Sequence, residues 1–239
     1  MTRRRHARGR AAIIAAAVGV LVVVGATAAS ALARPSVDPS PAAPVSAAPA
    51  AAATVPLAPL VAAWPDAYTV TGTKAEPLYT ERITATRSGE RFAVRIEAIG
   101  QGDAAMGTQV SVVSVSSGAV TWRTGCTKSP AECDADPALR GFLATAAVTA
   151  LAQSGRLPAT GTARVLHGAP VVCIEDAALH PDAAPAVVEL DPCVDPATGA
   201  VLGHWSPDSR AFVGPTLAAG FRVTTAPDLG LLPAPPSVP

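Results

Sequence analysis

Four cysteines carry the clearest chemistry in this 239-residue chain. Cys126 and Cys133 are separated by six residues in TGCTKSPAEC, and Cys173 and Cys193 fall on segments that we expect to be paired strands. An even number of cysteines is typical of disulfide-bonded proteins in oxidising compartments. We therefore predict two disulfides, 126–133 and 173–193.

Other cysteine chemistry does not fit these spacings. Redox dithiols use C-x-x-C, and a zinc site would need a histidine at short spacing from two cysteines, which the chain lacks. The register of the 173–193 pair stays open. Directly opposite cysteines would place Glu175 against Asp191, whereas a diagonal offset would avoid this pair of like charges.

Acidic residues near the second cysteine pair are the only candidates for a metal site. They are Glu175, Glu189, Asp191 and Asp195. Calcium sites are built from a loop that supplies alternating oxygen ligands, and this pattern is absent from the sequence. A solvated acidic edge is therefore the preferred interpretation, and we predict no metal.

Catalytic motifs are also absent. The sequence has no G-x-S-x-G, no H-E-x-x-H, no Walker loop and no dinucleotide-binding fingerprint. His167, His180 and His204 are scattered, and His6 lies in the basic N-terminal arm. We predict no catalytic residue and no cofactor, and hence a protein that is not an enzyme.

The N-terminal segment determines where the protein resides. Residues 11–33 carry no charge, and 23 residues are enough to span hydrocarbon about 30 Å thick. Five arginines precede this segment and only Arg34 closely follows it, so we expect a single-pass membrane anchor with residues 1–10 in the cytoplasm. The alternative is a signal peptide cleaved near Ala33, after which the protein would be secreted. Both interpretations export all four cysteines.

Composition divides the exported part into a spacer, a domain and a tail. Residues 34–63 contain seven prolines and much alanine, which favours a disordered, extended linker. We expect a folded domain over residues 64–225 and a disordered, Pro-rich tail over 226–239. The exported part has 13 basic and 18 acidic residues, a net charge of −5, so nucleic acid is not an expected partner.

Hydrophobic periodicity predicts an α+β domain. Residues 91–98 alternate most clearly, with Phe92, Val94 and Ile96 on one face. A helix is expected over 137–153, between an Asp136–Pro137 start and Gly155. The other predicted strands are 78–87, 108–116, 119–124, 163–167, 171–175, 186–190, 200–205 and 220–225. We expect one curved antiparallel sheet of roughly seven to nine strands with the helix on its concave side.

Two sequence patterns carry a resemblance to a known superfamily. One is a strand, a Gly-containing turn and a strand from Thr162 to Glu175, and the other is D-P-A-T-G from Asp195 to Gly199. Over residues 78–206 the chain resembles the half-barrel superfamily of the outer-membrane lipoprotein carrier, the mycobacterial lipoproteins LppX and LprG, and the sigma-factor regulator RseB. The resemblance implies a curved sheet over helices, an apolar cavity that holds acyl chains in several members, and no catalytic residues.

Two functional hypotheses follow. The first is a membrane-anchored, extracytoplasmic binding domain for a lipid or another apolar ligand. Its lining would come from nine apolar residues: Phe92, Val94, Ile96, Val120, Trp122, Leu139, Phe142, Leu143 and Leu151. The alternative interpretation of these residues is that they simply pack together as a core. The second hypothesis is a tethered sensor or interaction module that contacts another envelope protein.

Overall fold

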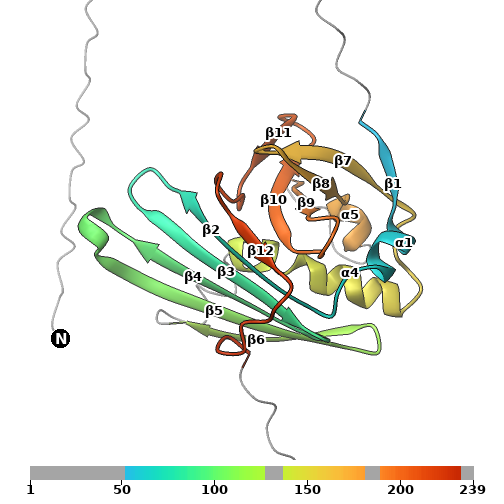
Figure 1. The fold of residues 1–239 in the computed structure, drawn as a ribbon, viewed down its shortest axis with the longest axis horizontal. Coiled ribbons are helices and arrows are strands. Elements are labelled where there is room, and N and C mark those ends of the chain that lie inside the picture. The colour runs from blue at the N-terminus through green and yellow to red at the C-terminus, as the bar shows by residue number, and fades with distance from the viewer. Residues whose placement is uncertain (1–51, 127–136, 181–188, 233–239) are drawn as a thin grey trace, which may run out of the picture. The chain divides into compact units, whose positions relative to one another are not determined.

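The computed structural model describes residues 52–126, 137–180 and 189–232, which form two antiparallel sheets and a few short helices (Figure 1). Sheet A consists of β1 (Thr54–Pro56), β7 (Thr160–Leu166), β8 (Ala169–Cys173), β9 (Asp191–Val194), β10 (Val201–Ser206) and β11 (Ala211–Val213), in that order. Sheet B consists of β12 (Arg222–Thr224), β2 (Ala67–Ala75), β3 (Thr80–Ser88), β4 (Arg91–Ile99), β5 (Ala105–Ser116) and β6 (Ala119–Cys126). The helices are α1 (Leu57–Ala62), η1 (Gln101–Asp103), α3 (Pro137–Gly141), α4 (Ala144–Gln153) and α5 (Asp176–Leu179). The predicted α+β class is confirmed, with β structure dominant.

Sheet B is the predicted meander. Strand β4 pairs with β3 and β5 along its length, and Phe92, Val94 and Ile96 lie on its buried face. Ala93 on the opposite face is also buried, because residues 226–232 cover it with Leu231 and Leu232. This part of the predicted disordered tail is therefore packed against sheet B, and residues 233–239 lie outside the described residues.

The single sheet that we predicted is replaced by two sheets of six strands, which meet at residues 214–218, here called the seam segment. In this segment the Leu217 N–H donates to the carbonyl of Leu202 in β10 at 2.9 Å. The next residue, Ala218, donates its N–H to the carbonyl of Thr73 in β2 at 2.7 Å. Consecutive residues thus bind one sheet each, and the hydrogen-bond ladder is interrupted where the chain passes from sheet A to sheet B.

The predicted helix over 137–153 is divided into α3 and α4. The division falls after Gly141, a residue type that disfavours helix interiors. A Cβ atom on Gly141 would lie 2.8 Å from Cε1 of His204, so the glycine permits this close approach. Helix α3 contacts β4 and β5 of sheet B and also β10 of sheet A. The predicted end of the helix at Gly155 is confirmed by its φ of +68°.

The folded part begins earlier than predicted. Strand β1 pairs with β7, and Leu57 of α1 is fully buried, so the linker predicted for 34–63 ends before Thr54. Strand β2 was not predicted at all. The strand predicted at 186–190 is wrong for its last two residues, because β9 begins only at Asp191, and residues 186–188 are not described.

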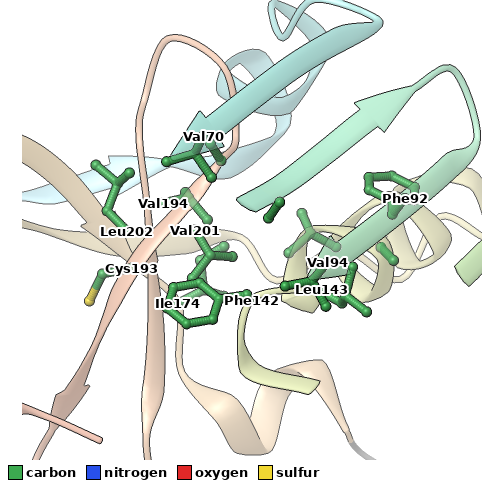
Figure 2. Packing of buried hydrophobic residues seen from close by; sticks show 14 of the residues in the cluster. Val70, Phe92, Val94, Phe142, Leu143, Ile174, Cys193, Val194, Val201 and Leu202 are labelled. Carbon is green, nitrogen blue, oxygen red and sulfur yellow. The ribbon is translucent and has the colours of Figure 1, made fainter. Parts of the chain in front are cut away.

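One hydrophobic core joins both sheets to the helices. Figure 2 shows side chains of this cluster, with Val70, Phe92 and Val94 from sheet B and Val194, Val201 and Leu202 from strands β9 and β10 of sheet A. Phe142 and Leu143, at the break between α3 and α4, belong to the same cluster. The helices therefore share the inner side of sheet B with residues of sheet A.

Candidate functional site

The structure brings the predicted apolar residues together. Phe92, Val94, Ile96, Leu139, Phe142, Leu143 and Leu151 belong to the core, with exposed fractions of 0–5%. Val120 of β6 is half-buried against them. The backbone of Trp122 pairs with Val113, and its side chain lies outside the described residues. In the described state these side chains fill the space between sheet B and the helices themselves.

The inner face of sheet B, defined as the face that packs into this core, changes character along the strands. Successive rows of paired residues read Tyr68–Arg87–Phe92–Val113, Val70–Ala85–Val94–Ser111, Gly72–Ile83–Ile96–Gln109 and Lys74–Glu81–Ala98–Gly107. The last rows lie where the β2–β3 and β4–β5 hairpins close, side by side at one end of the sheet (Figure 1). We call this the hairpin end. Its rows keep two large apolar residues, Ile83 and Ile96, and otherwise consist of small or polar ones, namely Gly72, Gln109, Lys74, Glu81, Ala98 and Gly107.

A partly buried charge cluster lies at the hairpin end. The Lys74 Nζ is 3.2 Å from Oε2 of Glu81 and also pairs with Glu76. Burial disfavours the charged form of Lys74, but its hydrogen bonds and charge interactions with the two carboxylates outweigh burial and raise its pKa. The cluster combines one lysine with two glutamates, so it carries an excess of negative charge.

Gln109 on β5 is paired with Ile96 on this inner face and has a buried, unsatisfied amide oxygen. Its Oε1 is shielded from solvent, and among the described residues no donor bonds to it. Most buried polar atoms in proteins have a partner, because an unmatched acceptor loses its hydrogen bonds to water without compensation. The sequence offered no signal for this residue beyond a polar side chain within a β-branched run.

The Cys173–Cys193 disulfide is present, and the two residues lie directly opposite one another on β8 and β9. The like-charge pair expected for this register does not form within the ladder, because β8 ends at Cys173. Instead, the N–H of Asp176 in α5 donates to Oδ1 of Asp191 at 3.1 Å. The predicted 126–133 pair stays a prediction, because Cys133 lies outside the described residues.

Two of the other three predicted acidic residues, Glu175 and Glu189, do gather around Asp191. Burial raises the pKa of Asp191, the Asp176 N–H opposes this rise, and the charges of Glu175, Asp176 and Glu189 add to it. Asp195 instead accepts a hydrogen bond from the Thr198 hydroxyl. Among the described residues, no group of three His, Cys, Asp or Glu side chains is arranged to hold a metal ion.

The D-P-A-T-G turn is a packing site for two distant residues. Gly199, with φ of +77°, lies directly against the ring of Trp64, whose Nε1–H donates to the carbonyl of Pro196 at 3.2 Å. The Thr145 hydroxyl of α4 donates to the carbonyl of Gly199. The turn thus connects sheet A to α4 and to the chain just before β2, a role that its local sequence does not indicate.

The described histidines hold structural positions. His167 occupies the β7–β8 turn with φ of +51°, and its Nε2 lies 3.1 Å from the carbonyl of Leu217. His204 is buried, and its Nδ1 lies 2.9 Å from the carbonyl of Pro215, for which it is the donor. Burial lowers the pKa of His204 to about 4, although the Pro215 hydrogen bond opposes this shift. Exposed His180 lies 3.8 Å from a carboxylate oxygen of Asp176.

No protein-family model, curated protein or solved structure matches the chain. Within the described ranges, none of the helices has the length and apolar character needed to cross a membrane. The apolar segment 11–33 lies outside those ranges.

Proposed function

We propose that this chain is an exported, membrane-tethered, non-enzymatic domain that binds a lipid or another apolar ligand between the inner face of sheet B and helices α3 and α4. The observation that carries the proposal is the convergence of the predicted apolar residues on this one face, beneath the two helices. The described histidines support a non-enzymatic role, because the two of them that are not surface-paired bind backbone carbonyls.

A half-barrel architecture is part of this proposal. Its support is the order of elements, in which a meander is followed by helices and then by further strands, as the resemblance implies. The seam segment adds to this support, since its hydrogen bonds to Leu202 and Thr73 connect the two sheets edge to edge. In this arrangement the helices occupy the concave side of the curve.

Export is supported by the covalent chemistry of the domain. The Cys173–Cys193 disulfide is consistent with an oxidising, extracytoplasmic environment. We propose that residues 11–33 anchor the chain in the cell membrane and that the Pro-rich linker holds the domain away from it. Cleavage near Ala33 is the alternative, and it would leave the same domain free outside the cell.

A ligand would have to displace part of the core, because its lining residues are already in contact with one another. The break between α3 and α4 supplies a hinge for this movement, since Phe142 and Leu143 lie outside both helices yet fill the centre of the core. Movement of α3 about this hinge would withdraw Leu139 and open apolar surface on β4 and β5.

Native mass spectrometry of the full-length chain purified from its own membrane tests this proposal. We expect a bound lipid mass on the wild type and a larger bound fraction for Phe142→Ala, which enlarges the space beneath the helices. Phe212→Ala is the matched control, because Phe212 packs edge-on against Trp205 in sheet A and not on the inner face of sheet B. A ligand-free mass for the wild type and for Phe142→Ala would refute lipid binding.

The tight packing of the lining favours a second candidate, a tethered module that contacts an envelope protein. Seven of the nine predicted lining residues are at most 5% exposed, so this part of the core is packed without a ligand. Crosslinking in intact cells distinguishes the two candidates. One abundant crosslinked membrane or envelope protein would favour the interaction module, whereas crosslinks to lipid alone would favour the binding domain.

A further inference from the structure

The hairpin end differs from the rest of the inner face in a way that bears on the chemistry of a ligand. Across its last rows the sheet presents Gly72, Ala98 and Gly107, which leave little side-chain volume. Leu217 of the seam segment fills the space over Gly72, since a Cβ atom there would lie 3.1 Å from Leu217 Cδ2. Ala98 and Gly107 are only half-buried, and Gln109, with its buried amide oxygen, lies in the adjacent row.

Two acceptors flank this half-buried strip of β4. Gln109 Oε1 lies on the β5 side and has no donor within the part of the chain that the structure describes, and the Glu81 carboxylate lies on the β3 side. Glu81 is 9% exposed and shares Lys74 with Glu76, so one ammonium serves two carboxylates. The available hydrogen-bonding capacity at this end is therefore acceptor capacity, and the local charge is negative.

We infer that the hairpin end holds the polar head of an amphiphile, and that this head is an uncharged or cationic hydrogen-bond donor, such as a hydroxyl or an amine, bound by Gln109 Oε1. This inference rests on the proposed function, because the apolar tail of the same molecule would lie along the rows that contain Val94 and Phe92. The donor would give the amide oxygen a hydrogen-bond partner. Leaving this buried oxygen without a partner costs free energy in the ligand-free state.

The same charges disfavour an anionic head. A carboxylate or phosphate that met Gln109 Oε1 would find an acceptor without a proton. Rotation of the amide to present its Nε2–H donors would still leave the anion beside the excess negative charge of the Lys74 cluster. Lys74 does not offset this, because both of its carboxylate partners already neutralise it. The structure therefore assigns neutral or cationic amphiphiles, and not fatty acids, as the ligand class.

Two isomeric probes test the assignment on the full-length chain held in an amphipathic polymer. Decan-1-ol carries a hydroxyl donor, and 1-methoxynonane has the same composition without a donor. Equilibrium dialysis should show the wild type binding the alcohol about tenfold more tightly, the usual effect of one hydrogen bond to a buried acceptor. Gln109→Met, which keeps the side-chain volume and removes the amide, should bind both isomers equally. Gln101→Met, at an exposed position in η1, is the control and should keep the wild-type preference.

Each alternative result has a distinct meaning. Saturable binding of both isomers with equal affinity by the wild type would overturn the inference and leave the proposed function standing. Absence of saturable binding for both probes would overturn the proposed function itself.

The ligand-free variants provide a second measurement. Gln109→Met should melt at or above the wild-type temperature, because it removes an unmatched acceptor, and a clear decrease would overturn the inference by giving the amide a purely structural role. Gln109→Glu retains an acceptor and should retain the preference for the alcohol if Gln109→Met does not fold. Equal binding of the two isomers by Gln109→Glu would also count against the assignment.

Discussion

Acid should destabilise this domain through one buried histidine. His204 lies on β10 with its ring against Phe142 and Gly141, and its Nδ1–H donates to the seam carbonyl of Pro215. In the folded state burial favours the neutral ring and lowers the pKa to about 4, from 6.5 for an ordinary histidine. No charged side chain contributes to this shift.

The size of the effect follows from these two values. A group with a lowered folded-state pKa takes up its proton more readily in the unfolded state, so stability is intact above pH 6.5 and is lost as the pH falls toward 4. For these values the free energy of unfolding should decrease by about 2 kcal/mol between pH 7 and pH 5 and by about 3 kcal/mol at pH 4. This is a substantial share of the 5–15 kcal/mol that is typical of domain stability.

Urea denaturation at pH 7 and pH 5 measures the loss directly, and a double comparison isolates His204 from the carboxylates that also titrate. His204→Asn keeps a donor for the Pro215 carbonyl and has no proton to gain. It should be less stable than the wild type at pH 7, because ring packing is lost, yet it should lose about 2 kcal/mol less on moving to pH 5. His180→Asn, at a side chain 52% exposed, should keep the wild-type difference. Equal pH dependence of the wild type and His204→Asn would refute the reasoning.

Two further predictions concern stability. Cys173→Ser should lower the melting temperature more than Cys126→Ser, because the 173–193 link joins neighbouring strands across a sequence separation of 20 and should contribute about 2–4 kcal/mol. Thermal melts with non-reducing peptide mapping check this ranking, and equal melting points would contradict it. Gly199→Ala should destabilise the domain by about 2–4 kcal/mol, because its Cβ atom would lie 2.6 Å from the Trp64 ring at a positive φ. Gly168→Ala has a similar φ and open space, so it should lose only about 1 kcal/mol in the same melts.

Local patterning was sufficient for the elements with a regular apolar period. Strand β4 was predicted within one residue of its bounds, because Phe92, Val94 and Ile96 alternate with charged residues. Strand β2 escaped prediction, because its inner positions run from Tyr68 and Val70 to Gly72 and Lys74, so the apolar period is lost halfway along.

Features that depend on contacts distant in sequence could not be predicted. The division of the helix after Gly141 serves the approach of His204, which follows it by 63 positions in the numbering. The packing of Trp64 on Gly199 depends in the same way on the fold and not on either local sequence. The register of the disulfide was left open by a local charge argument, and the structure settles it because the chain leaves β8 before Glu175.

The loss of the apolar period halfway along β2 also bears on the role of the hairpin end. An inner face built for stability alone would continue with large apolar residues, since a partly buried ion pair such as Lys74–Glu81 is often no more stabilising than well-packed hydrophobic side chains. This face instead ends in an ion pair, two small residues and the unmatched acceptor of Gln109, none of which improves the packing of the core. A bound donor would turn the unmatched acceptor into a satisfied one, and the half-buried strip at Ala98 leaves that end less tightly covered than the core. The polar end therefore adds little to the stability of the fold, and it has the acceptor that the proposed binding of a polar head requires.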